Sequence, residues 1–246
     1  MTGGLPDAIN SFINDRNIFN IRKIQSDIYY YYGDGASKYD KDHKLKIKRI
    51  YDLIPSNLED KKKRVVVKNI ENIKGKRFSN YQDEFDFLIN SGIALEVKAI
   101  STPVFPLIES SGKNLLKLYL NDVGLLSNIL YKTNIKAILN DEKSINLGTI
   151  YESVVASELK AHGHNLFYYD NKANGEVDFL IDDYDTLSFL PLELKSGKNY
   201  TIHSAINKFL SNKSYNVKQG IVLSNEQKIF EKNNILYLPI YFVMFL

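Results

Sequence analysis

Two short apolar segments in the last third of the chain carry charged residues where a buried strand normally holds none. They are residues 175–179, with the sequence GEVDF, and residues 191–195, with the sequence PLELK. A charge in apolar surroundings costs several kcal/mol unless it is paired or binds a metal. We therefore interpret the two segments as parts of one site, and the fold has to bring them together.

The composition is that of a globular protein and excludes several other classes. Of 246 residues, 44% are apolar and 25% charged, which is enough to build a core without crosslinks. The net charge of +3 is too small to announce a nucleic-acid partner by itself. The chain has no cysteine, which excludes disulfides and thiolate metal sites, and it shows no charged-then-apolar leader, so a cytoplasmic location is expected.

No part of the sequence is expected to enter a membrane. The longest apolar run, residues 235–246, is interrupted by Pro239 and is too short to cross a bilayer. It is interpreted as a buried final strand, and its apolar end suggests that something packs over it.

Residues 1–43 are predicted to be a helical lead-in. Apolar residues recur at intervals of three and four positions and predict a helix over about 20–32. The run Gly33-Asp34-Gly35 is expected to end this helix.

Residues 44–140 are predicted to be a winged-helix-like module with a connector. A helix closed by Pro55 is followed by a segment that leads into Ile70 and Ile73, a third helix that opens at Ser79, and an alternating segment over 93–100 typical of an edge strand. A winged helix has this order of elements and often docks DNA through its third helix. In the connector, a strand over 117–120 precedes a helix that Asn121 and Asp122 are expected to cap.

Charge complicates the DNA interpretation of this module. The predicted third helix carries Asp83, Glu84 and Asp86 but no lysine, which is unfavourable for contact with phosphates. Basic residues gather instead in the range 61–77. They contact a nucleic-acid backbone in one interpretation and form a solvated face in the other, and both stay open.

Residues 141–246 are predicted to form an α/β domain with a mixed sheet and helices on its faces. If strands over 176–181 and 189–195 are neighbours joined by a turn at Asp182-Asp183, Asp178 can lie near Glu193. Glu193 and Lys195 share one face, because side chains alternate along a strand. The periodicity predicts helices over 149–161 and 202–210 and further strands over 165–169, 219–223 and 235–240.

This group of residues suits phosphodiester hydrolysis with Mg²⁺ or Mn²⁺. Asp178, Glu193 and the carbonyl of Leu194 are hard oxygen ligands of the kind these ions prefer. Lys195 would sit beside the attacking water and stabilise the charge that builds at phosphorus. A glutamate of the 149–161 helix would complete the ligand set. On a helical wheel Glu158 falls inside the apolar arc, whereas Glu152 falls at its edge.

The same residues resemble a known superfamily. Gly148-x-x-x-Glu152, then Gly175-Glu176-Val177-Asp178, then Glu193-Leu194-Lys195 resemble the PD-(D/E)XK nucleases. The whole chain is similar to the C-terminal part of bacterial and archaeal AAA+-type ATPases that carry such a domain, catalogued as a domain of unknown function. Further matching segments are 3–6 (GGLP), 119–126 (YLNDVGLL) and 148–159, which includes Glu158.

The resemblance implies a restriction-endonuclease-like fold for residues 141–246. It implies that Glu152, Asp178 and Glu193 are metal ligands and that Glu193 and Lys195 form the E-x-K pair. It favours Glu152, whereas the wheel favours Glu158, so both remain candidates. DNA and a missing ATPase domain, or its partner protein, are the partners that it implies.

The sequence departs from that family in one respect. It contains no G-x-x-x-x-G-K-[ST] motif, so no ATP site is expected here. The chain is then either an excised piece or a degenerate relative of the ATPases. Its function is expected to be that of a metal-dependent nuclease. The alternative is a catalytically inert nuclease-like module for DNA docking or protein assembly, in which the acids and Lys195 form a structural ion-pair network.

Overall fold

The computed structural model describes residues 2–39, 44–110, 115–132, 134–140, 146–196, 201 and 204–246. The chain forms two compact units, each made of two stretches. Unit 1 comprises Met1–Glu96 and Lys117–Val154, and unit 2 comprises Val97–Leu116 and Val155–Leu246. The boundaries fall inside two strands and one helix, so the sequence order of elements does not coincide with the units.

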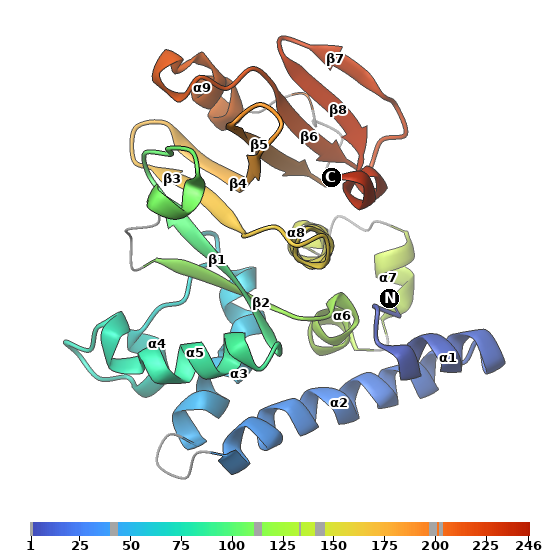
Figure 1. Cartoon of the computed structure of the whole chain (residues 1–246). Helices are drawn as coiled ribbons and strands as arrows, with labels where there is room; N and C mark the ends of the chain where they lie inside the picture. Colours follow the sequence, from blue (N-terminus) through green and yellow to red (C-terminus); the bar gives the residue numbers. More distant parts are fainter. Residues whose placement is uncertain are drawn as a thin grey trace. The chain divides into compact units, whose positions relative to one another are not determined.

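The strands form one mixed sheet in the order β2-β1-β3-β4-β5-β6-β8-β7 (Figure 1). Neighbours run parallel in the pairs β1–β3, β5–β6 and β6–β8, and antiparallel in β3–β4, β4–β5 and β7–β8. The strands are β1 (Ala94–Ile100), β2 (Leu116–Leu120), β3 (Phe167–Asn171), β4 (Gly175–Asp183), β5 (Ser188–Lys195), β6 (Gly220–Ser224), β7 (Phe230–Lys232) and β8 (Ile235–Pro239).

Unit 1 is mainly helical. Helix α2 packs against α1, α3 and α6, and α3 also packs against α4 and α5. Its buried side chains include Ile21, Tyr51 and Phe85, which supply the apolar faces that the helical spacing predicts. The helices are α1 (Pro6–Asp15), α2 (Ile18–Tyr39), α3 (Lys44–Glu59), α4 (Lys68–Glu71), η1 (Phe78–Tyr81), α5 (Gln82–Asn90), α6 (Val123–Tyr131) and α7 (Ile135–Leu139).

Helix α2 does not end at Gly33-Asp34-Gly35 as the sequence predicts, but continues to Tyr39. A Cβ atom on Gly33 would lie 3.3 Å from a ring carbon of Tyr51 on α3. The glycine therefore permits close packing of two helices here and does not act as a helix stop.

The prediction that Pro55 closes a helix is also wrong, because α3 runs through Pro55 to Glu59. A proline inside a helix removes one backbone hydrogen bond and usually bends or breaks the helix. Here Ile54 and Leu58 on either side of the proline are fully buried, and this packing holds the last turn in place. Ser56 lies inside α3, and its hydroxyl donates to the carbonyl of Leu53 at 3.0 Å.

The strand predicted over 93–100 is confirmed as β1, but its predicted place at a sheet edge is wrong. It lies between β2 and β3, and β2 is the edge strand. The N–H of Ala99 donates to the carbonyl of Leu115, and the N–H of Lys98 donates to that of Leu166. An alternating pattern reports one apolar face and does not report the number of hydrogen-bonded neighbours.

Of the two residues predicted to cap the helix after β2, Asn121 and Asp122, only Asp122 does so. Asp122 is the N-cap of α6, and its Oδ1 accepts from the N–H of Leu125 at 3.2 Å. The second carboxylate oxygen accepts from the N–H of Gly4 at 2.5 Å, so Asp122 also holds the start of the chain.

Unit 2 holds a core between the sheet and α9 (Ser204–Ser211), which packs on β4 and β5. Tyr169, Phe209 and Tyr215 form its aromatic centre, with 3.1 Å between the hydroxyls of Tyr169 and Tyr215. Burial, followed by this hydrogen bond, raises the pKa of Tyr215 to about 12. The rigid core supports β4 and β5 from one side.

Three details of unit 2 differ from the sequence predictions. The β4–β5 turn lies at residues 184–187, because Asp183 still pairs with Ser188 in the ladder. Strand β7 was not predicted. The final strand ends at Pro239, and residues Ile240–Phe245 form a 3-10 helix, η4, on which Phe245 is 72% exposed. Pro239 has no N–H to extend the ladder, which explains the change.

Candidate functional site

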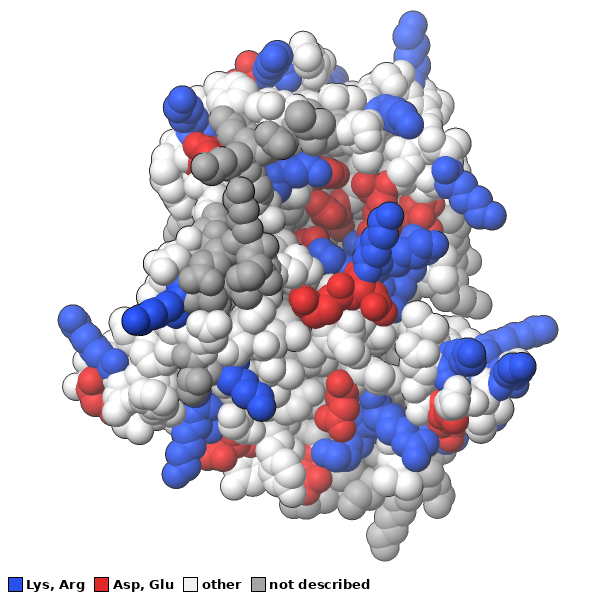
Figure 2. Space-filling model, turned by 180° about the vertical axis from the view of Figure 1, so that it is seen from behind, with Lys and Arg blue, Asp and Glu red and all other residues white. Residues whose placement is uncertain are grey.

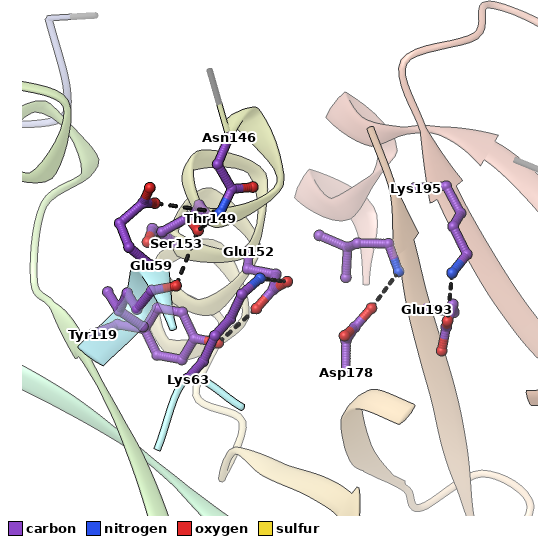
Figure 3. Close-up of polar contacts among 12 residues, drawn as sticks. Glu59, Lys63, Tyr119, Asn146, Thr149, Glu152, Ser153, Asp178, Glu193 and Lys195 are labelled. Atoms are coloured by element: carbon purple, nitrogen blue, oxygen red, sulfur yellow. Dashed lines mark hydrogen bonds and ion pairs between the residues drawn. The ribbon is translucent and has the colours of Figure 1, made fainter. Parts of the chain in front are cut away.

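The end of the β4–β5 ladder is where three of the predicted residues meet (Figure 3). The ladder's last pair at this end is Phe179 with Leu192. One residue further, the Oδ2 atom of Asp178 accepts from the N–H of Leu194 at 2.7 Å. A side-chain carboxylate of β4 therefore accepts a hydrogen bond from a backbone N–H of β5. The predicted approach of Asp178 to the Glu193 segment is confirmed.

Glu193 and Lys195 lie on one face of β5 and form an ion pair. The Nζ of Lys195 is 2.8 Å from Oε1 of Glu193. Glu193 is only 6% exposed, whereas the Lys195 side chain is 29% exposed. The pair offsets the desolvation of the buried carboxylate and leaves the ammonium group in reach of solvent.

Strand β5 holds this pair rigidly. On the side away from β4, Glu193 pairs with Val222 and Lys195 with Ser224 in the parallel ladder with β6. Backbone pairing thus continues past the point where β4 and β5 separate. The site consists of one fixed strand end and one carboxylate from the neighbouring strand.

The helix glutamate that the resemblance favours, Glu152, lies in unit 1. It belongs to α8 (Leu147–Ala161) and is 6% exposed. Its Oε2 accepts from the hydroxyl of Tyr119 at 3.0 Å, and its Oε1 forms an ion pair with Lys63 (Figure 3). Both carboxylate oxygens of Glu152 thus have partners within unit 1.

The buried face of α8 is more polar than a helical wheel suggests. Thr149 donates to the carbonyl of Leu58 at 3.1 Å, and Ser153 donates to the carbonyl of Thr149 at 2.9 Å. Hydroxyl groups that bond to backbone carbonyls can be buried at little cost. On the helical wheel Thr149 and Ser153 count as polar positions, so the expected buried face is turned away from them.

The wheel prediction that Glu158 lies on the buried face is therefore wrong. Its side chain is 44% exposed and lies 4.0 Å from His162, one turn further along the helix. The helix ends there as predicted: Gly163 has a left-handed backbone (φ 89°), and the N–H of His164 donates to the carbonyl of Leu159. The sequence also offers Lys198 as a phosphate contact, and two histidines, His43 and His203, that share no metal-ligand spacing. All three lie outside the described residues.

The structure brings Asp178, Glu193 and Lys195 together within unit 2 and gives Glu152 separate partners in unit 1. Across the described residues, no group of three or more Asp, Glu or His side chains is arranged to hold a metal ion. A ligand role for Glu152 or Glu158 stays a prediction. Sequence reasoning missed Lys63 and Tyr119 as partners of Glu152; Tyr119 opens one of the matching motifs, but nothing local singles out Lys63.

The fold and this site define a mixed-sheet α/β protein with a helical N-terminal region. Residues 1–136 match the family model described as a domain of unknown function (DUF8612), and residues 147–243 match another described as a domain of unknown function (DUF4143). The first match covers more than half of the chain, so the protein belongs to the DUF8612 family. DUF4143 is known as a C-terminal region of AAA-type ATPases, which supports that part of the resemblance.

The other comparisons are negative. Neither the curated proteins nor the solved structures include a match to this chain. Among the described residues, the helices are too short or too polar to span a bilayer.

Proposed function

We propose that this chain is the nuclease-like C-terminal part of an AAA-type ATPase and hydrolyses phosphodiester bonds with a divalent metal ion. The observation that carries the proposal is the meeting of Asp178, Glu193 and Lys195 at the end of the β4–β5 ladder. The E-x-K pair and the aspartate thus lie on adjacent strands. The DUF4143 match over residues 147–243 supports the ATPase context.

The proposed fold of residues 141–246 is restriction-endonuclease-like, with a winged-helix-like module before it. The chain order α8-β3-β4-β5-α9-β6 supports the first part, because it gives a mixed sheet with helices, as the resemblance implies. Three helical segments, α3, α4 and α5, precede β1, in support of the second.

The donor set fits Mg²⁺ or Mn²⁺. Mg²⁺ commonly binds through one or two carboxylates and completes its shell with waters and substrate phosphate. Asp178, Glu193 and the carbonyl of Leu194, all in unit 2, would hold the ion. When bound, the ion would polarise a phosphate oxygen and lower the pKa of a coordinated water.

The residues of the chain have separate roles in this proposal. The N–H of Leu194 holds the Oδ2 atom of Asp178. This hydrogen bond fixes the orientation of the carboxylate and so the direction in which its Oδ1 atom lies. Glu193 holds the Lys195 ammonium group in place, and Lys195 stabilises negative charge that develops at phosphorus.

A second function is favoured by one observation. Asp178 and Glu193 already accept hydrogen bonds from the chain, and the described residues contain no group of three metal-binding side chains. A catalytically inert nuclease-like module, used for DNA docking or for assembly with an ATPase domain or its partner protein, would have the same ion pair for stability.

Cleavage of DNA separates the two functions. Supercoiled plasmid, linear duplex and single-stranded DNA are incubated with the full chain and 5 mM Mg²⁺ or Mn²⁺, with and without EDTA. The nuclease proposal expects cleavage that EDTA abolishes and that Asp178→Asn and Lys195→Met each reduce at least about 100-fold, in line with the loss of one electrostatic catalytic group.

The matched control is Glu231→Gln on β7, which removes an exposed carboxylate from the same sheet and should leave cleavage unchanged. Folding of each variant is checked by circular dichroism. Cleavage that persists equally in Asp178→Asn and Lys195→Met would show a contaminating nuclease. Its absence with either metal would favour the inert module.

A further inference from the structure

Positive charge in this protein is concentrated in one segment of unit 1. Residues 61–77, called the basic segment below, connect α3 to η1 and contain a single acid, Glu71. The net charge of the basic segment is +7, whereas that of the whole chain is +3, so the remainder of the chain is net negative. Its basic residues are Lys61, Lys62, Lys63, Arg64, Lys68, Lys74, Lys76 and Arg77.

Most of these cations are exposed. Lys63 and Arg64 are the exceptions: Lys63 turns inward and pairs with Glu152, and Arg64 is only partly exposed, with its Nε atom buried. In Figure 2, Lys and Arg side chains project at the edge of the molecule where α4 lies, as they do at other edges. The ion pair of Lys63 therefore anchors the basic segment to α8, while six of its other cations face solvent. The exposed ones are Lys61, Lys62, Lys68, Lys74, Lys76 and Arg77.

The one acid of the basic segment offsets one of its eight positive charges, and the net charge of +7 already includes it. Glu71 accepts a hydrogen bond from the hydroxyl of Tyr81 at 2.6 Å. That bond, followed by the nearby charges of Lys46, Lys76 and Arg49, lowers the pKa of Glu71. Two of these cations belong to α3, so the positive surface extends from the basic segment onto that helix.

The backbone of the basic segment changes direction often. Helix α4 has only four residues and ends at Glu71; the next residue, Asn72, has a left-handed backbone (φ 56°), as does Gly75 (φ 85°). The cations are consequently distributed along a turning chain and not along one helix face. The basic segment therefore contains no helix long enough to lie in a membrane interface as an amphipathic helix does.

We propose that the basic segment binds the phosphate backbone of duplex DNA. A cluster of exposed Lys and Arg on an otherwise net negative protein matches the electrostatic requirement for contacts with phosphates. Helix α5, the third helix of the predicted winged-helix-like module, does not meet it, because Asp83 and Asp86 are exposed there. We therefore assign the DNA contact to the basic segment, which precedes α5 in the chain, and not to α5 itself.

This contact uses residues of unit 1 and none of the residues of the β4–β5 site, and it does not require hydrolysis. Binding by phosphate contacts is expected to be independent of DNA sequence and strongly dependent on salt, with a slope of about −0.9 per phosphate neutralised. If the nuclease proposal failed, the basic segment would still bind DNA.

The test measures fluorescence anisotropy of a labelled 30-base-pair duplex with the full chain in EDTA, at 50 to 200 mM salt. The test variant combines Lys61→Gln, Lys62→Gln, Lys68→Gln and Lys74→Gln. It should weaken binding at 50 mM salt by at least about tenfold and make the salt slope less steep by about one for each phosphate that the protein no longer neutralises. Glu231→Gln, which changes an exposed carboxylate on β7, should bind as the unchanged protein does.

The matched control removes the same charge from unit 2, through Lys213→Gln, Lys218→Gln, Lys228→Gln and Lys232→Gln, all exposed positions. Its affinity should stay within about twofold. Equal losses in the test and control variants would overturn the proposal, since only net charge would then matter. Binding to vesicles with anionic lipid but not to DNA, or no binding to duplex DNA at 50 mM salt, would overturn it too.

Discussion

Two buried glutamates of this protein are each compensated by a lysine, but over different distances along the chain. The partner of Glu193 is Lys195, two residues further on the same strand. The partner of Glu152 is Lys63, which is 89 positions earlier. The first pair follows from the alternation of side chains along a strand. The second depends on how α3, its following loop and α8 pack, which no local pattern reports.

Removal of the Glu152 carboxylate should destabilise the protein. Glu152→Ala leaves the ammonium group of Lys63 and the hydroxyl of Tyr119 without their acceptor. Breaking a buried ion pair on one side costs about 3 kcal/mol. Urea unfolding followed by circular dichroism should show this loss in the free energy of unfolding.

Glu158→Ala is the control on the same helix. Glu158 is half exposed and 4.0 Å from His162, and an exposed pair of this kind contributes at most about 0.5 kcal/mol. If the two variants were equally stable, the assignment of Glu152 as the buried partner of Lys63 would be wrong.

The hydrogen bond between Tyr81 and Glu71 should make stability depend on pH. It is the main cause of the lowered pKa of Glu71, so the stabilisation is present above the ordinary pKa of 4.5 and is lost as the pH falls through the lower folded value. Tyr81→Phe should reduce stability by about 1 kcal/mol at pH 7. The difference from the unchanged protein should shrink below about pH 4, measured by urea unfolding across that range. A difference that is constant with pH would contradict it.

At the scale of elements, patterns within one segment of the sequence predicted the helices and strands. The effect of contacts between segments could not be predicted from such patterns. Strands β3 to β6 and helix α8 lie close to their predicted positions, because apolar alternation and helical spacing are local properties. The predictions at Gly33 and Pro55 were wrong for a common reason. Each residue weakens a helix locally, and packing of α2 on α3 or burial of Ile54 and Leu58 outweighs that tendency.

Asp122 offers a test of one element boundary that the sequence predicted correctly. Asp122→Ala removes the acceptor for the N–H groups of Leu125 and Gly4. The loss of an N-cap of this kind costs about 1 to 2 kcal/mol. Thermal unfolding should show the corresponding fall in the midpoint temperature.

Asn134→Ala is the matched control for that cap. Asn134 precedes α7 but makes no side-chain hydrogen bond to it, so its removal should change stability by less than about 0.5 kcal/mol. An equal loss in both variants would mean that the bonds of Asp122 contribute nothing beyond those of any residue at a helix start.

For the whole molecule, the sequence predicted which residues would gather on β4 and β5 but not how the sheet extends around them. Asp178, Glu193 and Lys195 meet because the two strands are joined by a short turn, and short connections are predictable. The insertion of β1 between β2 and β3 involves strands far apart in the sequence, and it was not predicted.

The same three residues allow metal binding to be measured through the stability of the entire chain. A ligand that binds only the folded state adds about 1.4 kcal/mol to stability at ten times its Kd, which corresponds to a rise of about 3 to 6 °C in Tm for a chain of this size. Mn²⁺ should produce such a rise in the unchanged protein, and EDTA should reverse it. Glu193→Gln should abolish the rise, because it removes one of two carboxylate ligands.

Lys195→Met separates binding from catalysis in the same measurement. It removes the cation that competes for Glu193, so the Mn²⁺-dependent rise in Tm should persist or increase even though DNA cleavage is lost. Glu231→Gln, on β7, should respond as the unchanged protein does. Equal rises in the unchanged protein and in Glu193→Gln would place Mn²⁺ elsewhere. That result would mean that Glu193 binds no metal ion. The ion pair of Glu193 and Lys195 would then be a structural contact of an inert module.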